Sequence, residues 1–351
     1  MRKKVKVLSV TSGKLTPSSR FRIRQHIDKL NELDVCVEDA CPFIDKNKSV
    51  PGLSKYSPKY YLPLYLIWQL VKILQRIPIF LKQFQYDFIW LNRELLTGYL
   101  TLEPLFRKKI ILDVDDAIWK NPPFGQFAAK FLAKKAHKII CGNEYLADWF
   151  QKYNDKVYIV PTAVDTEKFR PIMHDKNTIT IGWIGTHGNL KYLERIYSSL
   201  LEILGLYPHV RLSIVSDQKP NFITTNKSIK FTEWSAANEV NDFQNIDIGL
   251  MPLDDDEWTR GKCSYKMLQH MSCGALVVGS PVGMNKNILQ GEINGAYPVR
   301  DNDDWIRILT TLIDNFPELY SAQSTLARNF IVKEYSADVV RLKLAKVFAD
   351  E

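Results

Sequence analysis

Residues 180–217 read TIGWIGTHGNLKYLERIYSSLLEILGLYPHVRLSIVSD, and the fold class follows from them. The apolar run 180–185 predicts a buried strand, and 189–207 has the periodicity of a helix. A second apolar run, 211–217, predicts the next strand. A strand, a helix and a strand in this order require a crossover connection, which pairs the strands in parallel. The stretch therefore predicts an α/β domain.

The same alternation occurs in both halves of the chain. In the first half it predicts helices over 21–33 and 125–136 and strands over 5–10, 34–40, 86–92, 109–117, 137–143 and 156–164. In the second half, further strands are expected over 229–234, 246–253 and 275–280. The polar, proline-containing stretch 161–177 is typical of a linker. We expect two doubly wound domains, 1–165 and 166–335, with a helix at 336–351 that can pack back on the first. Ligands of such domains bind beyond the carboxyl ends of the strands, so a cleft between the domains is the expected site.

Composition excludes several protein classes. The 351 residues are 46% hydrophobic and 25% charged, which is close to the average for globular proteins and excludes disordered and disulfide-scaffold chains. The apolar part of MRKKVKVLSV is too short for a signal peptide. An odd number of cysteines without a CxxC pair or zinc spacing indicates reduced thiols in a cytoplasmic protein. These cysteines are Cys36, Cys41, Cys141, Cys263 and Cys273.

The net charge of +8 is unevenly distributed. Residues 1–150 contain 25 Lys and Arg against 14 Asp and Glu, whereas the rest of the chain is slightly acidic. A basic half indicates an anionic partner, either nucleic acid or a membrane surface. The chain lacks a nucleic-acid-binding signature, so the membrane surface is favoured.

Residues 60–84, YYLPLYLIWQLVKILQRIPIFLKQF, are basic and amphipathic. Pro63 and Pro78 bracket a stretch that can be helical. Polar residues interrupt the apolar run, so we do not expect it to span a membrane. These residues are Gln69, Lys72, Gln75 and Arg76. Two interpretations stay open: a helix lying in the interface of an anionic membrane, or a helix packed on its own sheet.

Two loops have the composition of phosphate-binding segments. Residues 182–189, GWIGTHGN, follow a predicted strand and open a helix, where glycines and free N–H groups favour phosphate. Residues 254–266, DDDEWTRGKCSYK, follow another strand; in them Gly261 to Ser264 can present successive N–H groups at a helix start near 262. Lysines and an arginine close by suit a diphosphate. A solvated loop with surface ion pairs is the alternative for the second segment.

Residues 269–283, QHMSCGALVVGSPVG, make the sequence resemble a known family. They are similar to the segment EAMACGxPVVAS of the bacterial family 4 retaining glycosyltransferases, which have the GT-B fold of two Rossmann-like domains around a central cleft. GEINGAY (291–297) and PTAVD (161–165) resemble further family segments. SSRFRIRQHIDKL (18–30) and ILDVDDAIW (111–119) resemble a polysaccharide-assembly branch. The resemblance covers nearly the whole chain and is strongest over 240–300.

The resemblance implies a donor site with several substitutions. Gln269 stands where the family has the glutamate that binds the nucleotide ribose, and Gly261 stands where the family has its other glutamate. Thr186 replaces an arginine near the diphosphate. We therefore expect Arg260, Lys262 or Lys266 to supply the positive charge. The candidate donor-binding residues are Gly13, Gly185, Thr186, His187, Asn189, Ser216, Asp217, Trp234, Arg260, Gly261, Lys262, Cys263, Ser264, Tyr265, Lys266 and Gln269.

Catalytic and acceptor-side residues are expected at acidic clusters. Asp115 and Asp116 are candidates for positioning an acceptor hydroxyl, and Glu257 for replacing the missing glutamate. Lys262 is the candidate for stabilising the leaving group. Arg20, Arg93, Glu94 and Asp113 are the expected acceptor-side residues. Asp113 and Asp115 share a strand face that could meet a divalent ion. GT-B enzymes generally act without metal, however, so no metal or other cofactor is expected.

The expected function is transfer of a sugar from a nucleotide-diphosphate donor to a hydroxyl of a glycan or lipid-linked acceptor, with retention, in cell-surface polysaccharide or lipopolysaccharide synthesis. The expected location is the cytoplasm, at the inner face of the membrane. The main alternative is a non-catalytic nucleotide-sugar or glycan-binding protein of the same fold, which the changes at Gly261 and Gln269 leave open. An epimerase or phosphorylase is a second alternative, although no lysine for pyridoxal phosphate is recognisable.

Overall fold

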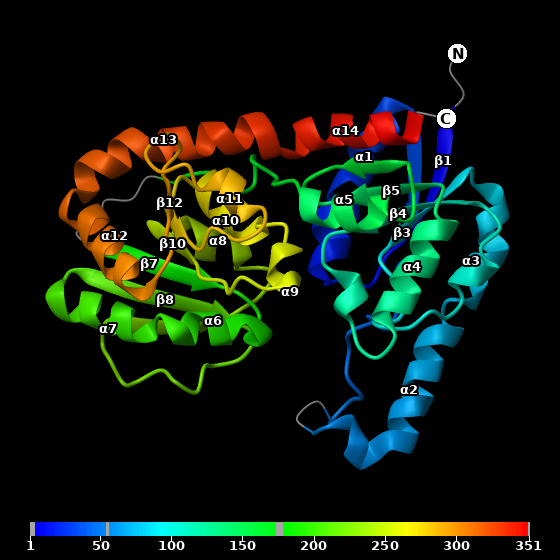
Figure 1. Cartoon of the computed structure of the whole chain (residues 1–351), viewed down its shortest axis with the longest axis horizontal. Coiled ribbons are helices and arrows are strands. Elements are labelled where there is room, and N and C mark those ends of the chain that lie inside the picture. Colours follow the sequence, from blue (N-terminus) through cyan, green and yellow to red (C-terminus); the bar gives the residue numbers. More distant parts are fainter. Residues whose placement is uncertain (1–3, 54–55, 173–177, 350–351) are drawn as a thin grey trace. The chain divides into compact units, whose positions relative to one another are not determined.

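The computed structural model describes residues 4–53, 56–172 and 178–349 of the chain. The chain divides into two compact units (Figure 1). Unit 1 comprises Met1–Thr162 and Val340–Glu351, and unit 2 comprises Ala163–Val339. The chain thus changes unit after residues 162 and 339, compared with the expected domain ends at 165 and 335. Residues 173–177 of the expected linker and 350–351 of the expected last helix lie outside the described residues.

Unit 1 is built on a six-stranded parallel sheet, as the alternation of apolar runs predicted. Its strand order is β2-β1-β3-β4-β5-β6. The strands are β1 Val5–Val10, β2 Val35–Asp39, β3 Phe88–Asn92, β4 Lys109–Val114, β5 Lys138–Cys141 and β6 Val157–Ile159. Helices α4 (Gly125–Lys135) and α5 (Glu144–Gln151) connect the later strands. The order reverses between β1 and β3, and ligands of such sheets bind at this kind of switch point.

The helix expected over 21–33 is irregular, so that prediction was wrong in detail. The segment is a π-helical turn at Ser19–Ile23, a 3₁₀ turn at Arg24–His26, the four-residue helix α1 (Ile27–Leu30) and a second 3₁₀ turn at Asn31–Leu33. Side chains at its start are held by hydrogen bonds to other strands, which override local periodicity. A π-helical turn of this kind is frequent at functional sites.

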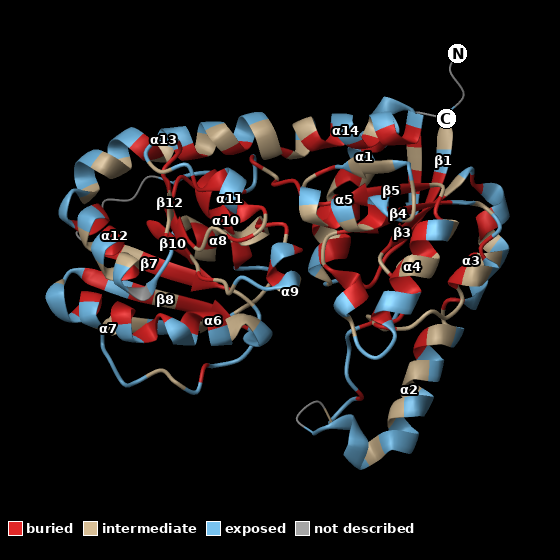
Figure 2. Cartoon of the chain, viewed as in Figure 1, coloured by how far each residue is buried: buried red, intermediate tan, exposed pale blue. Residues whose placement is uncertain are grey.

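Helix α2 (Leu62–Leu74) is amphipathic, but its polar side faces the protein and its apolar side faces outward. Its side facing unit 1 is polar: Lys72 Nζ donates to the carbonyl of Lys46 (2.8 Å), and Trp68 Nε1 donates to the carbonyl of Lys48 (3.0 Å). Its outward side is apolar, and Figure 2 shows that most of the helix is exposed or half-buried. The outward residues include Leu62, Leu64, Leu66, Ile67, Leu70, Val71 and Leu74.

The wider segment Pro58–Gln85 has the length and composition of a membrane-crossing helix, and 17% of its most apolar window is buried. Length and composition alone are weak evidence, because a signal sequence or a buried core helix passes the same test. The backbone turns at Gln75 and Arg76 before α3 (Ile77–Lys82), so the segment is two helices. Helix α2 therefore does not pack wholly on its own sheet.

Unit 2 has a second six-stranded parallel sheet, of order β12-β11-β10-β7-β8-β9. Its strands are β7 Ile179–Ile184, β8 Val210–Ser216, β9 Ile229–Glu233, β10 Ile248–Met251, β11 Leu276–Gly279 and β12 Ala296–Pro298. The helix expected over 189–207 is present as α6 (Leu190–Arg195) and α7 (Tyr197–Leu206). The remaining helices are α8 Glu239–Gln244, α9 Glu257–Arg260, α10 Tyr265–Ser272, α11 Asn285–Ile288, α12 Asn302–Asp314 and α13 Phe316–Tyr335. The strand order reverses between β7 and β10.

The last helix, α14 (Ala337–Ala349), contributes to the core of unit 1. The ring of Phe348 packs edge-on against Trp90 of β3, with 5.1 Å between ring centroids. Lys138 of β5 is fully buried, and its Nζ donates to the carbonyl of Val347 at 2.6 Å. The first strands of the chain are therefore packed against its last residues.

Candidate functional site

In unit 2, two loops meet at the carboxyl ends of β7 and β10. The loop after β7 ends at Asn189, and the loop after β10 leads to Lys262. Lys262 Nζ donates to Asn189 Oδ1 at 3.4 Å and lies 5.8 Å from the centroid of the Trp258 ring. The contact joins the two segments that the sequence singled out for phosphate binding, and it places a cation at the switch point of the sheet.

Lys266 and Gln269 lie one turn apart on α10. Lys266 Nζ donates to Gln269 Oε1 (3.2 Å) and pairs with the buried Glu239 carboxylate (3.6 Å). Gln269 is fully buried, and its Nε2 has no hydrogen-bond partner among the described residues. An amide with an unused donor suits a ligand that brings hydroxyl oxygens, and Lys266 supplies positive charge beside it.

The amides of Gly261 and Lys262 are not arranged as the sequence predicted. They donate to the carbonyls of Trp258 (3.2 Å) and Thr259 (3.0 Å), closing the last turn of α9. The next helix, α10, begins at Tyr265, and Ser264 before it has a left-handed backbone (φ 52°). The predicted row of phosphate-binding amides was thus wrong for Gly261 and Lys262, because their amides are used to close the last turn of α9. The predicted helix start near 262 was also wrong, because α10 begins at Tyr265.

Ser264 and Cys263 are buried parts of this turn. Ser264 Oγ donates to Asn285 Oδ1 at 2.5 Å, and Asn285 Nδ2 donates to the carbonyl of Ser280 (2.9 Å). The bonds tie the start of α10 to the segment after β11. The positions of the Lys262 and Lys266 side chains are therefore fixed by the turn between α9 and α10.

The acidic run 254–257 is used largely for local structure. Asp254 pairs with Arg195, and Asp255 pairs with Arg260 Nε at 2.6 Å. Asp256 caps α9, accepting from the amide of Thr259 at 2.8 Å. The Arg260 guanidinium is thus held by Asp255, which lowers the pKa of that carboxyl. Glu257 is exposed in the first turn of α9, and its catalytic role stays a prediction.

The loops after β7 and β8 are linked through His187 and Asp217. Asp217 accepts from the His187 amide (2.7 Å) and contacts His187 Nδ1 (2.6 Å). Burial opposes ionisation of Asp217, but these bonds lower its pKa. The buried Ser216 Oγ donates to Asp217 Oδ1 (3.3 Å), and the Trp234 amide donates to the Ser216 carbonyl (3.0 Å). The ends of β7, β8 and β9 thus form one connected rim.

Gly185 and Thr186, in the loop after β7, each have a local structural role. A Cβ on Gly185 would lie 2.5 Å from the Trp183 ring, so a side chain does not fit there. Thr186 Oγ1 accepts from Asn189 Nδ2 at 3.1 Å. Thr186 therefore orients Asn189, which in turn contacts Lys262.

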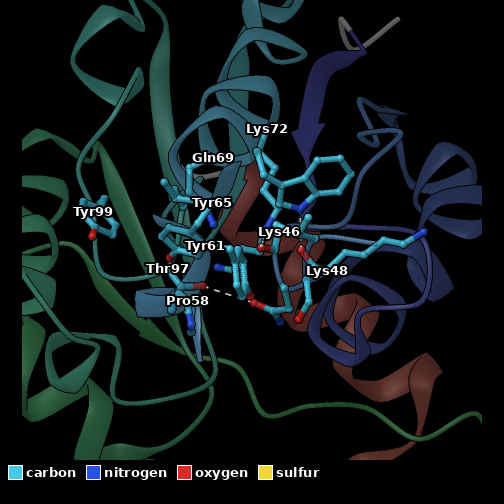
Figure 3. A pocket seen from close by; sticks show the side chains of 14 residues that line it. Lys46, Lys48, Pro58, Tyr61, Tyr65, Gln69, Lys72, Thr97 and Tyr99 are labelled. Atoms are coloured by element: carbon cyan, nitrogen blue, oxygen red, sulfur yellow. Dashed lines mark hydrogen bonds between the residues drawn. The ribbon is translucent and has the colours of Figure 1, made fainter. Parts of the chain in front are cut away.

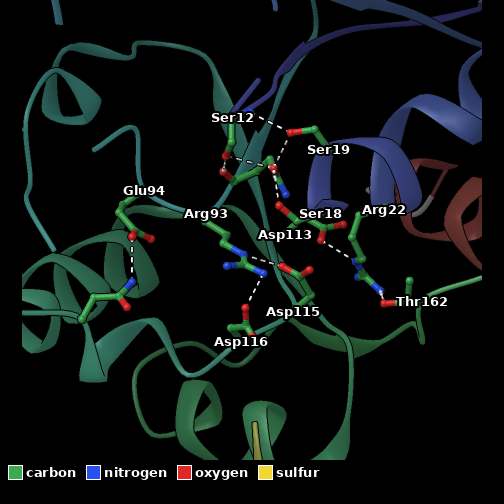
Figure 4. Close-up of polar contacts among 12 residues, drawn as sticks. Ser12, Ser18, Ser19, Arg22, Arg93, Glu94, Asp113, Asp115, Asp116 and Thr162 are labelled. Carbon is green, nitrogen blue, oxygen red and sulfur yellow. Dashed lines mark hydrogen bonds and ion pairs between the residues drawn. The ribbon is translucent and has the colours of Figure 1, made fainter. Parts of the chain in front are cut away.

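In unit 1, Arg93, Asp115 and Asp116 come together at the ends of β3 and β4 (Figure 4). Arg93 has a left-handed backbone (φ 59°) and pairs with both acids of the 115–116 cluster. Its Nε lies 2.5 Å from Asp115 Oδ1, and its Nη2 lies 2.6 Å from Asp116 Oδ2. Burial opposes these charges, but the pairing lowers the pKa of Asp115 and raises that of Arg93. Asp115 is consequently held as a carboxylate, and the arginine fixes the orientation of both acids.

Asp113 does not belong to the accessible site, so that prediction was wrong. It is fully buried, accepts from Arg22 Nε (2.8 Å) and accepts from Trp90 Nε1 (3.2 Å). Arg22 comes from the π-helical turn and also donates to the carbonyl of Val160 (2.7 Å). Asp113 thus fixes the irregular turn to the sheet instead of facing a ligand.

The remaining acceptor-side residues have distinct surroundings. Glu94 is buried and accepts from Asn121 Nδ2 (2.9 Å), while Lys46 Nζ lies 3.7 Å from its Oε1. Arg20 stacks on the neighbouring Phe21 ring, 4.6 Å from the centroid. Gly13, expected to contact the donor, has the Asp45 carboxylate where a Cβ would stand. A glycine is therefore required at position 13 for packing within unit 1.

A cluster of serines around Asn92 was missed by the sequence analysis. Asn92 Oδ1 accepts from the hydroxyls of Ser12 (3.1 Å), Ser18 (3.2 Å) and Ser19 (3.1 Å), all buried. Figure 4 shows Ser12, Ser18 and Ser19 close together. The run of hydroxyl residues between 11 and 19 was the signal available, and nothing local in the sequence identifies Asn92 as its partner.

Asp113 and Asp115 do not come together as the two ligands of one ion. Asp113 pairs with Arg22, and Asp115 pairs with Arg93. Within the described parts of the chain, no group of three or more His, Cys, Asp or Glu side chains is placed to hold a metal ion. The five cysteines are free thiols.

Comparisons with known proteins place this geometry in context. Residues 178–315 match the family model of the group 1 glycosyl transferases. No curated protein matches the chain. Sucrose-phosphate synthase from Thermosynechococcus elongatus is similar in structure, with a TM-score of 0.73, 13% identity and 98% of each chain covered.

Two further solved structures are similar. Anabaena HepE in complex with UDP-glucose has a TM-score of 0.70 and 13% identity, covering 98% of this chain and 99% of the other. A glycosyltransferase from Rickettsia africae has a TM-score of 0.64 and 13% identity, covering 98% of each chain. At these identities the likeness shows a shared fold.

Proposed function

We propose that this chain, a group 1 glycosyltransferase of the GT-B fold, transfers a sugar from a nucleotide-diphosphate donor to a hydroxyl of a glycan or lipid-linked acceptor. The observation that carries the proposal is the contact of Lys262 with Asn189 at the switch point of unit 2, together with the contact of Lys266 with Gln269 at the start of α10. The solved structure of HepE holds UDP-glucose, which supports a nucleotide-sugar donor here.

The reaction requires charge stabilisation more than covalent catalysis. The bond between the anomeric carbon and the diphosphate oxygen breaks, a bond to the acceptor oxygen forms, and the acceptor proton passes to the departing diphosphate oxygen. Negative charge develops on the diphosphate, so cations fixed beside it lower the barrier. Lys262 and Lys266 supply these cations, and the free amide hydrogens of Gln269 donate to the ribose. Retention at the anomeric carbon and the absence of a metal requirement are part of the proposal.

Unit 1 supplies the acceptor side. Asp116 is the more exposed member of the pair held by Arg93, and its carboxylate accepts a hydrogen bond from the acceptor hydroxyl. A carboxylate paired with arginine is a weak base, so Asp115 and Asp116 orient the hydroxyl and stabilise positive charge more than they remove the proton. The left-handed backbone of Arg93 is a strain of the kind that recurs at functional sites.

The acceptor is proposed to reside at the inner face of the cytoplasmic membrane, as in cell-surface polysaccharide synthesis. The exposed apolar side of α2 supports peripheral contact with the membrane through residues 60–84. Moving apolar side chains from water into the headgroup region lowers the free energy. The basic composition of residues 1–150 supports an anionic surface.

A panel of sugar nucleotides tests the proposal. Release of nucleoside diphosphate that depends on an added acceptor supports transfer, and tight binding without release under any acceptor supports the rival binding protein. Thermal stabilisation by UDP, GDP and dTDP identifies the nucleotide, since a tenfold preference corresponds to about 1.4 kcal/mol.

Lysine variants test the placement of the leaving group. Lys262→Ala and Lys266→Ala are each expected to weaken nucleoside diphosphate binding at least tenfold in a titration. Lys333→Ala, on the exposed side of α13 and paired only with Glu334 at 3.8 Å, is the matched control and should bind as the unaltered chain does. Unchanged binding in both site variants would show that the diphosphate lies elsewhere.

A further inference from the structure

A cavity of about 240 Å³ lies beside α2 in unit 1, outside the acid cluster at Arg93 (Figure 3). The loop 46–50 forms one wall, and the polar side of α2 with the turn before it forms another. Leu96, Thr97 and Tyr99 close it. Three tyrosines line it, Tyr61, Tyr65 and Tyr99, and their rings form walls on which a sugar or head group can stack.

The lining of the cavity is cationic. Lys46, Lys48 and Lys72 are among its fourteen residues, and none of the fourteen is acidic. The surrounding sequence has the same bias, because residues 46–86 contain seven Lys and Arg and no Asp or Glu. A cavity of this composition attracts an anion.

Lys72 lacks a carboxylate partner in the described part of the chain. It is buried, and its Nζ donates only to the Lys46 carbonyl, at 2.8 Å. Burial lowers the pKa of Lys72 to about 8. Lys46, by contrast, is neutralised by Glu94 at 3.7 Å. An ammonium group with further N–H donors and no counter-charge is stabilised by a bound anion such as a phosphate.

The apolar side of α2 begins next to this cavity. Leu66, Ile67 and Leu70 are 57%, 58% and 52% exposed, and they point away from the residues that line the cavity. One side of the helix therefore suits a charged head group, and the other side suits hydrocarbon. A ligand with a phosphate joined to a lipid tail satisfies both sides.

We propose that this cavity binds the phosphate-bearing head group of a membrane lipid, with Lys72 contacting the phosphate and the apolar side of α2 lying among the lipid tails. This inference deepens the proposed function, because it identifies the bound lipid as the membrane anchor of the acceptor. That identification rests on the proposed function. Lys46 then connects the two sites, since it lines the cavity and also pairs with Glu94, next to Arg93.

Flotation of the full chain with vesicles tests the proposal. Vesicles of phosphatidylcholine alone are compared with vesicles that also contain phosphatidic acid, a lipid with an exposed phosphate. Lys72→Met should weaken binding to the second kind at least tenfold, and Lys72→Arg should restore most of it. Lys59→Met removes an equal charge from an exposed position of the same segment outside the cavity and should change binding less than threefold. Equal effects of the two methionine variants would overturn the proposal.

Two further arms separate the contributions. Leu66→Gln combined with Leu70→Gln should reduce binding to both kinds of vesicle, because it removes the apolar contact. Inorganic phosphate at millimolar concentration should compete poorly with vesicles; full competition would show that the cavity takes free phosphate and would overturn the lipid assignment. Stabilisation by UDP, measured on each variant, reports folding and donor binding. Failure of the unaltered chain to bind either kind of vesicle, with UDP binding intact, contradicts this inference alone, whereas lack of UDP binding in the unaltered chain contradicts the proposed function.

Discussion

His270 shows how a single buried side chain in α10 makes the stability of unit 2 depend on pH. A Cβ on Gly249 of β10 would stand 2.5 Å from the His270 ring, and the Phe243 ring lies edge-on at 4.7 Å. Neither ring nitrogen has a hydrogen-bond partner among the described residues. Burial, helped by the charge of Lys266, lowers the pKa of His270 to about 3. The folded protein therefore holds this imidazole neutral.

His270→Phe is expected to flatten the pH dependence of unit 2. In the unfolded chain the imidazole of His270 binds a proton below about pH 6.5, whereas in the folded chain it stays neutral down to about pH 3. The free energy of unfolding therefore decreases as the pH falls through this range. The substitution should lower the slope by about 1.4 kcal/mol per pH unit and leave stability at pH 7 nearly unchanged. Urea unfolding between pH 4.5 and 7 measures both quantities. The same slope in both proteins would show that His270 is protonated in the folded state.

At the level of single residues, the sequence identified candidate site residues better than it identified their burial and their partners. Lys262, Lys266 and Gln269 were singled out; in unit 2 Lys262 contacts Asn189 of the other predicted loop, and Lys266 contacts Gln269. Asp113 was misplaced, because alternation along a strand gives the face of a side chain but not its depth, and Arg22 of a distant turn neutralises it. Burial of an ion pair depends on contacts that no local pattern records.

Among the elements, the turn at Ser19–Ile23 depends on one acceptor. Asn92 receives three buried serine hydroxyls, two of them from Ser18 and Ser19. Asn92→Ala leaves the hydroxyls of Ser18 and Ser19 without this acceptor, whereas Ser12 keeps the backbone carbonyl of residue 92 at 3.3 Å. The variant should lower the free energy of unfolding of unit 1 by about 2–3 kcal/mol. Asn31→Ala, which removes one partly buried hydrogen bond from the amide of Val37, is the control and should cost under about 1 kcal/mol. Urea unfolding gives both values; similar costs would mean that the serines find water or other partners.

The same turn explains which elements could be predicted. The strands were predicted because buried parallel strands are continuous apolar runs, but the three-residue edge strand β12 was missed. The segment 21–33 has helical periodicity, yet its hydrogen bonds to β3 and β4 impose π and 3₁₀ geometry. For α2, periodicity left two interpretations open, and only the contacts of Trp68 and Lys72 with the loop 46–48 show which side faces the protein.

For the whole molecule, the path of the chain joins distant parts of the sequence in one unit. Residues from Val340 onward belong to unit 1, although almost all of unit 2 lies between them and the first strands. The sequence predicted a helix at 336–351 that can pack back on the first domain, but it could not identify the residues that the helix contacts. Trp90 and Lys138 are that partner, both fully buried against Phe348 and Val347.

Phe348→Ala is therefore expected to destabilise the N-terminal sheet from the opposite end of the chain. Removing a fully buried aromatic ring costs about 3–5 kcal/mol, and the loss falls on unit 1 because the ring packs on Trp90 of β3. Hydrogen exchange should show reduced protection of amides in β1 and β3, while those in β7 and β8 keep theirs and UDP binding persists. Leu342→Ala, at a 56% exposed position of the same helix, should change stability by less than about 0.5 kcal/mol. Equal loss of protection in both sheets would mean that the two units unfold as one, and α14 would then stabilise the whole chain instead of unit 1.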